Sequence, residues 1–283
     1  MNQNPKIAFL GTPDIARVFL DALIAANMSP TVVVTNPDKP VGREQTLTPS
    51  SVKVSAHSHN IPVLQPETID DVFIAELSKE PWDLFIVVAY GMILPQALID
   101  IPKHGTLNVH FSLLPRWRGA SPVEAAILAG DTETGVAIQR MRFKLDSGPI
   151  VAQEKTAISE YETAPELRTR LGEIGSKLLI DTLPHYLADE IALHEQDESL
   201  VTKAAKMKKE DGELLLSDDA ITKWRKYRAY KQWPGTFFVH EKSAGTSIRV
   251  KITDASFENG VFTILRVIPE GKREMNYEDF IRA

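Results

Sequence analysis

The chain has 283 residues, of which 43% are hydrophobic and 25% charged, and its formal net charge is −6. These values are typical of a globular protein with a large and a small domain, and they argue against a globally basic nucleic-acid binder. Cysteine is absent, which excludes disulfides, thiolate metal sites and a Cys nucleophile. The start of the chain is polar, and the longest apolar run, residues 84–94, is too short to span a membrane. We therefore expect a cytoplasmic protein without a membrane segment.

The first 185 residues alternate apolar runs with helical stretches. A strand at 7–10 and a helix at 13–27 are followed by four further predicted strands, at 31–35, 84–89, 105–110 and 135–141. Continuous apolarity, without alternation, indicates strands that are covered on both faces. This pattern predicts an α/β domain with a Rossmann-like, mostly parallel sheet. Functional sites in such sheets gather at the carboxyl ends of the strands.

The rest of the chain predicts a second, smaller domain. A helical pattern at 164–188 precedes polar sequence at 194–199, which is the expected linker region. A helix at 218–230 then leads into short β-rich runs, which indicate a small barrel or open sheet at 236–240, 247–253 and 261–267. The expected boundaries are therefore a first domain over 1–188, a linker over 189–205 and a small C-terminal domain over 206–283.

Two candidate ligand sites are weak. Gly11 lies at a strand-to-helix turn, but only the first glycine of the dinucleotide fingerprint G-x-G-x-x-G is present, so a tight turn is the better interpretation. His57 and His59 stand two apart in a predicted helix, so they point to different faces and cannot jointly bind a metal. No other group has the spacing of metal ligands, and we expect no metal.

Asn108 and His110 form a stronger candidate site. They stand two apart at the end of a predicted strand, so their side chains project on the same side. An amide can stabilise a developing oxyanion, and an imidazole can move a proton near neutral pH. Asp146 follows the next predicted strand and would orient the ring if it reaches His110. Two alternatives stay open: a hydrogen-bonded pair that only fixes a strand end, and an Asp146 that only forms a turn.

A basic stretch lies near the predicted domain boundary. Residues 203–231 carry nine Lys or Arg against five Asp or Glu. Within it, residues 223–228 mix bases with aromatics, a combination that suits contacts with RNA phosphates and bases. The alternative is a solvated helix face, with Ile221, Trp224 and Tyr227 turned inward.

Taken together, these segments resemble the methionyl-tRNA formyltransferases. The central match is "NVHFSLLPRWRGASP" at 108–122 with "LDSGPI" at 145–150, a combination specific to folate-dependent formyltransferases. Further matches cover nearly the whole chain: "GTPD" at 11–14, "NPDKPVGR" at 36–43, "VK" at 52–53, "AYGMILP" at 89–95, "ETGVAIQRM" at 133–141, "RAYKQWPGTF" at 228–237 and "PEGKREMNYEDFIR" at 269–282.

The resemblance implies transfer of a formyl group from 10-formyltetrahydrofolate to the α-amine of Met on initiator tRNA, by a monomer that uses no metal. It implies a catalytic trio of Asn108, His110 and Asp146. The folate pocket is expected from residues in two segments: Tyr90, Gly91, Ile93, Leu94, Ser112, Leu113, Leu114 and Pro115. Contacts with tRNA are expected from five basic residues: Lys39, Arg43, Lys206, Lys208 and Arg225. The C-terminal domain would be the tRNA-binding one and OB-like.

Three departures from the family pattern stand out. Phe111 replaces the usual glycine beside His110, and residues 44–46 read Glu-Gln-Thr where a more basic run is typical. The C-terminal region is also short by one or two strands, so a closed five-stranded barrel is not expected. Two alternatives therefore remain: a nucleotide-sugar N-formyltransferase, and a catalytically silent relative that binds RNA or folate.

Overall fold

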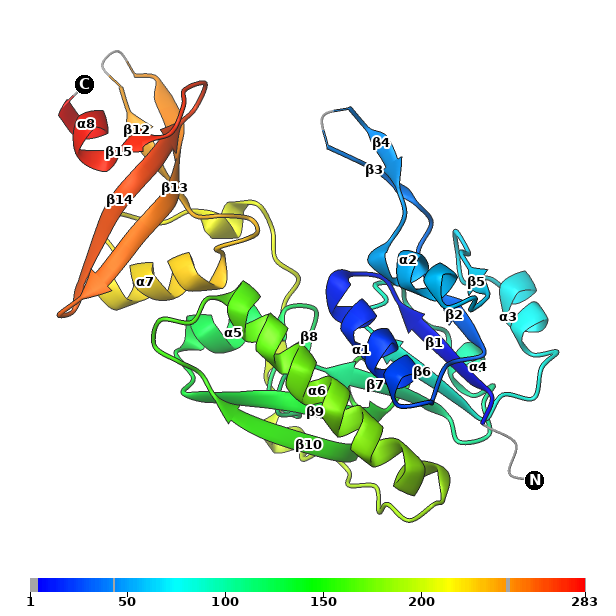
Figure 1. Ribbon diagram of the computed structural model, residues 1–283. Coiled ribbons are helices and arrows are strands. Elements are labelled where there is room, and N and C mark those ends of the chain that lie inside the picture. Colours follow the sequence, from blue (N-terminus) through cyan, green and yellow to red (C-terminus); the bar gives the residue numbers. More distant parts are fainter. Residues whose placement is uncertain (1–4, 43, 243–244, 283) are drawn as a thin grey trace. The chain divides into compact units, whose positions relative to one another are not determined.

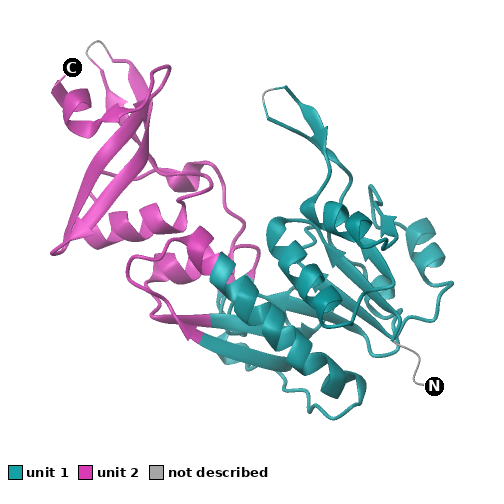
Figure 2. Cartoon of the chain, viewed as in Figure 1, with its two compact units in different colours: residues 1–118, 135–155, 169–202 teal, residues 119–134, 156–168, 203–283 magenta. Residues whose placement is uncertain are grey.

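The computed structural model describes residues 5–42, 44–242 and 245–282. The chain divides into two compact units (Figure 2). Unit 1 comprises residues 1–118, 135–155 and 169–202, and unit 2 comprises residues 119–134, 156–168 and 203–283. Unit 2 thus includes two segments from within the predicted first domain, 1–188. The predicted linker, 189–205, is divided between the units at residue 202.

The central sheet has seven strands in the order β10-β9-β7-β6-β1-β2-β5 (Figure 1). The pairs β2–β5, β1–β2, β1–β6 and β6–β7 are parallel, and β7–β9 is antiparallel. The sheet is therefore mostly parallel and Rossmann-like, which confirms the predicted fold class. The strands are β1 (Ile7–Gly11), β2 (Val32–Val34), β5 (Val63–Leu64), β6 (Leu84–Val88), β7 (Thr106–His110), β9 (Glu133–Arg140) and β10 (Ile150–Ala157).

The strand order reverses between β1 and β6. From β1 the chain moves outward to β2 and β5, then returns to β6 on the other side of β1 and continues to β7. Ligands of open α/β sheets bind at such a switch point, outside the carboxyl ends of the strands. The segments that follow β6 and β7 are those in which the sequence predicted the site.

Helices cover both faces of this sheet. Helix α6 (Ala164–Leu187) packs closely on α1 (Asp14–Ala25), because a Cβ added at Gly172 would lie 2.4 Å from Cδ1 of Ile15. The opposite face packs against α3 (Asp71–Leu77) and α4 (Gln96–Ile99) in one apolar cluster. Helix α2 (Ser51–Ser58) contacts α1.

The pleat of β7 separates Phe111 from the polar pair that precedes it. On one face, Oγ1 of Thr106 donates to the carbonyl oxygen of Ile99 in α4 at 2.8 Å, and Asn108 and His110 share this side by alternation. The ring of Phe111 instead packs edge-on against Phe19 of α1, with centroids 6.1 Å apart. Phe111 is thus buried against α1, on the side of the sheet opposite to Asn108 and His110.

Unit 2 contains an antiparallel sheet in the order β12-β13-β14-β15. Trp224 and Tyr227 of α7 are buried in its apolar core, as predicted, whereas Ile221 is 38% exposed. Within the described residues this is a four-stranded sheet and not a five-stranded barrel. Its elements are α5 (Pro122–Ala129), α7 (Ala220–Ala229), β12 (Phe237–Glu241), β13 (Ser247–Glu258), β14 (Val261–Pro269), β15 (Met275–Asn276) and α8 (Tyr277–Arg282).

The remaining elements are short. They are β3 (Lys39–Val41), β4 (Thr46–Thr48), β8 (Arg118–Gly119), β11 (Lys203–Ala204) and the 3-10 helices at Glu198–Leu200 and Glu210–Gly212. Across residues 5–42, 44–242 and 245–282, we find no helix that is long and apolar enough to span a membrane.

Candidate active site

The structure brings Asn108, His110 and Asp146 together. Nδ2 of Asn108 lies 3.5 Å from Oδ1 of Asp146, and Nδ1 of His110 lies 3.6 Å from the same oxygen. The side chains of His110 and Asp146 are both nearly buried. An amide donor, an imidazole and a carboxylate therefore meet just beyond β7. The spacing of these residues in the sequence did not by itself show that Asp146 reaches the other two. Both contacts are long, so these groups are not locked to one another.

The imidazole of His110 is oriented by a backbone group. Its Nε2 lies 2.8 Å from the carbonyl oxygen of Trp117, and because a carbonyl only accepts, Nε2 must carry a proton. A neutral ring then has its lone pair on Nδ1, the nitrogen that faces Asp146. The hydrogen bond to Trp117, which the sequence did not predict, therefore orients the ring. Asp146 is placed to stabilise a positive charge on it.

Gln139 is a fourth polar member that the sequence analysis missed. Its Nε2 donates to Oδ1 of Asp146 at 2.9 Å, and its Oε1 accepts from the backbone N–H of Gly148 at 3.1 Å. Gln139 stands opposite Asn108 in the β7–β9 register, so the two side chains share a face. The signal that could have identified it is a polar residue near the end of an otherwise apolar strand.

Strained backbone surrounds this cluster. Ala89, Trp117 and Asp146 all have positive φ, at 47°, 61° and 48°. Such values are uncommon for residues other than glycine, cost on the order of 1 kcal/mol each, and concentrate at functional sites. Each of the three lies in a loop that borders the predicted site.

The predicted folate-pocket residues fall in two loops after neighbouring strands. After β6, Tyr90 and Leu94 are buried, Gly91 has a φ of 86°, and Ile93 is 83% exposed. Phe143 and Leu145, beside Asp146, are also largely exposed apolar side chains. Apolar surface is thus exposed in the loop after β6 and in the segment that carries Asp146.

The second loop follows β7. Ser112 is fully buried, and its hydroxyl donates to the carbonyl oxygen of Arg116 at 2.6 Å. Leu114 is buried, and its carbonyl oxygen accepts from Gln153. The Leu114–Pro115 peptide is cis, and Leu113 packs close to Gly135. These contacts give the loop a fixed backbone, while the assignment of all eight residues to a folate pocket stays a prediction.

The hydroxyl of Tyr90 is buried and has no hydrogen-bond partner within the described part of the chain. Burial raises the pKa of Tyr90 to about 12. At neutral pH, Tyr90→Phe is therefore expected to be as stable as the wild type, or more stable by up to about 1 kcal/mol, because the deleted hydroxyl has no hydrogen-bond partner among the described residues.

The same substitution is expected to change stability in alkali. Between pH 10 and 12 the unfolded chain loses the Tyr90 proton while the folded chain keeps it, so the wild type loses stability as the pH rises. Tyr90→Phe removes this loss, which we expect to be about 1–2 kcal/mol. Urea unfolding at pH 7 and pH 11 measures it, with the exposed Tyr161→Phe as control. If the free energy of unfolding depends on pH equally in both variants, Tyr90 is not the source of the loss in alkali.

The segment between β2 and α2 carries Lys39, the first of the predicted tRNA contacts, and contains a β-hairpin. Strands β3 and β4 pair antiparallel, and Lys39 is exposed on β3. At the base, Nζ of Lys53 lies 2.8 Å from Oδ2 of Asp38. Hydrogen bonds from Lys53 and Gln65 hold the pKa of Asp38 below its usual range. The hairpin is therefore anchored at its base, while Arg43 lies outside the described residues.

The other three predicted tRNA contacts belong to unit 2. Lys206 and Lys208 are exposed. Arg225 is half-buried on α7, with its guanidinium lying over Gly130 at the end of α5. Arg228 is buried instead and donates to the carbonyl oxygens of Ser159 and Glu162. The basic helix therefore serves partly in packing, and the tRNA contacts stay a prediction.

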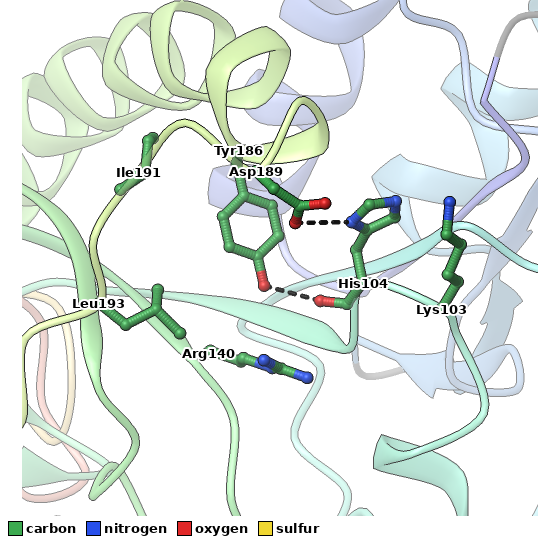
Figure 3. Close-up of a pocket in the computed structure, with 7 residues that line it drawn as sticks. All are labelled: Lys103, His104, Arg140, Tyr186, Asp189, Ile191 and Leu193. Atoms are coloured by element: carbon green, nitrogen blue, oxygen red, sulfur yellow. Dashed lines mark hydrogen bonds and ion pairs between the residues drawn. The ribbon is translucent and has the colours of Figure 1, made fainter.

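A separate cavity of about 130 Å³ lies in unit 1 (Figure 3). Its Tyr186 hydroxyl donates to the carbonyl oxygen of His104 at 2.7 Å, and Nδ1 of His104 lies 3.5 Å from Asp189. It contains no member of the polar cluster, since it is lined by Lys103, His104, Arg140, Tyr186, Asp189, Ile191 and Leu193. Among the described residues, no three His, Asp or Glu side chains are grouped as metal ligands would be.

The fold is that of a formyl transferase. The family model with that description matches residues 5–183, more than half of the chain. An N-formyltransferase from Helicobacter canadensis, solved with folinic acid and dTDP-3-aminofucose, aligns over 90% of this chain and 88% of its own. Its TM-score is 0.68 at 18% identity, which supports the fold alone.

Similar proteins identify one family within the formyl transferases. A methionyl-tRNA formyltransferase from Methylococcus capsulatus is 39% identical over 301 residues, covering 98% of this chain and 96% of that enzyme. One from Chloroflexus aggregans is 44% identical over 260 residues, covering 90% and 84%. The chain belongs to the methionyl-tRNA formyltransferase family, and the resemblance drawn from the sequence is confirmed.

Proposed function

We propose that this chain transfers a formyl group from 10-formyltetrahydrofolate to the α-amino group of Met on initiator tRNA, with Asn108, His110 and Asp146 as its catalytic residues. The observation that supports these roles most directly is the convergence of their three side chains at 3.5–3.6 Å. We further propose that it acts as a monomer in the cytoplasm, which sedimentation and cell fractionation test.

His110 serves as the base in this proposal. The attacking α-amine must be neutral, and a free α-amine titrates near pH 8, so a base with access to its proton is useful. With Nε2 donating to Trp117, the nitrogen that accepts a proton is Nδ1. The positive charge that forms there lies 3.6 Å from Oδ1 of Asp146, and this carboxylate stabilises it.

Asn108 stabilises the charge that develops on the formyl oxygen. Among the described residues, the hydrogen-bond partner of its amide is Asp146, at the long distance of 3.5 Å, so an N–H can turn to a substrate oxygen. A donor fixed at the end of a strand loses little entropy when the charge appears, which is why such donors contribute strongly to acyl transfer. Gln139 keeps the carboxylate in place while this happens.

Two loops, the one after β6 and the one that carries Asp146, have exposed apolar side chains suited to the formyl donor. Exposed apolar side chains at Ile93, Phe143 and Leu145 offer surface for a flat ring. As the new bond to the amine forms, the bond between the formyl carbon and the donor nitrogen breaks, and the proton held by His110 passes to that nitrogen as it leaves.

An acceptor assay tests the proposed function. Purified protein and 10-formyltetrahydrofolate are offered Met-initiator tRNA and an amino-sugar nucleotide in parallel, and formylated product is quantified by mass spectrometry. We expect only the tRNA to be formylated. Formylation of the sugar alone would establish the nucleotide-sugar alternative, and no product with either acceptor would favour the silent relative.

A further inference from the structure

The segment that the sequence predicted as a linker contacts the candidate active site at Gln196. This side chain is only 9% exposed. Its Nε2 donates to the carbonyl oxygen of Asp146 at 2.9 Å and to that of Gly148 at 2.7 Å. Both N–H groups of the amide therefore donate to the loop that carries the carboxylate of Asp146.

The other end of the same amide holds the loop after His110. Oε1 of Gln196 accepts from Nε of Arg118 at 2.9 Å, and Arg118 is 6% exposed. Nη2 of Arg118 also pairs with Glu198 at 2.9 Å. One buried glutamine thus connects the loop of Asp146 to the loop whose Trp117 carbonyl orients His110.

The backbone at Asp146 needs such support. Its φ of 48° is a strained value for aspartate, and a strained conformation persists only where surrounding contacts determine it. Gln139 fixes the carboxylate, whereas Gln196 fixes the main chain of the same residue. Exposed ion pairs between Arg142 and Glu195 and between Lys144 and Glu198 join the same two segments, but such pairs contribute little.

We propose that Gln196 is a positioning residue for formyl transfer, which acts by holding Asp146 at its distance from His110 and Asn108. This inference rests on the proposed catalytic role of Asp146. Because the contacts within the trio are already long, a shift of the loop by a fraction of an ångström changes whether Asp146 stabilises the imidazolium.

Gln196→Glu removes the two donated hydrogen bonds. The substitution keeps an acceptor for Arg118 but replaces the N–H groups with oxygen that repels both carbonyls. We expect kcat for formylation to fall by about 10–100-fold, with KM for tRNA and for the formyl donor within about threefold of wild type. Gln196→Met keeps a similar shape but cannot donate either hydrogen bond. We expect it to lower kcat by a comparable factor, and it replaces the Glu variant in the test if that variant does not fold.

A double-mutant cycle with Asp146→Asn distinguishes positioning from general stability. If Gln196 acts through Asp146, the Glu substitution changes kcat by less than about twofold in the Asp146→Asn background. Gln232→Glu, an exposed site in unit 2, is the matched control and should retain wild-type kcat. Thermal melts of all variants establish that the proteins compared are folded.

The possible results separate the two proposals. Unchanged kcat in folded Gln196→Glu, or the same loss in both backgrounds, would overturn the role of Gln196. If Asp146→Asn by itself leaves kcat unchanged, the proposed catalytic site is wrong, whatever the Gln196 variants do.

Discussion

His110→Ala is expected to lower kcat for formylation by about 1000-fold while Met-tRNA binding stays within about twofold of wild type. The reason is the loss of the base at Nδ1, and general-base catalysis is worth about 100–10,000-fold. Single-turnover formylation measures the chemical step, and filter binding measures the affinity for tRNA. The side chain is nearly buried, so a thermal melt accompanies both.

His185→Ala is the matched control for this substitution. His185 lies on α6 of unit 1, is largely exposed and pairs with Glu190. We expect wild-type turnover from it. If His110→Ala formylates at a near-normal rate, the imidazole is not the base, and the mechanism proposed here does not hold.

Asn108→Asp is expected to lower kcat by about 100–1000-fold, the usual effect of removing one oxyanion donor. The substitution keeps the shape of the side chain but removes its N–H. It also sets a second carboxylate at the position 3.5 Å from Asp146. Repulsion between two carboxylates opposes the charge distribution that the reaction needs.

Asn108→Ala separates these two effects, because it removes the donor without adding charge. We expect most of the loss to remain in this variant, measured as kcat under saturating donor and tRNA. Asn60→Asp is the control, since Asn60 is exposed with a φ of 57° and Asp tolerates that conformation. Turnover within about threefold of wild type in Asn108→Ala would contradict the role of the amide.

Much of the fold follows from local patterns in the sequence. The buried strands β1, β6 and β7 each lie within one residue of their predicted ends, because continuous apolar runs indicate strands covered on both faces. The hairpin of β3 and β4 was not predicted. Its strands are exposed, so they carry no pattern of burial from which a strand is recognised.

The candidate site was predictable only in part. The alternation of a strand puts Asn108 and His110 on one face and Phe111 on the other, and the structure agrees. From the sequence, Asp146 is either a turn former or the third member of the catalytic trio. In the fold its Oδ1 lies 3.5 Å from Nδ2 of Asn108 and 3.6 Å from Nδ1 of His110. Gln139 was overlooked because a single glutamine on a strand has no distinctive spacing.

What the sequence by itself determined were features set over a few residues: the strand and helix types, the face that each strand residue shares, and the motifs that carry the family resemblance. Only the tertiary structure decided which nitrogen of His110 is held by Trp117, and that Gln196, 50 residues after Asp146, supports its main chain. The physical reason is that carbonyl oxygens and glutamine amides occur all along a chain. Which of them meet is fixed by packing between distant segments, not by local sterics.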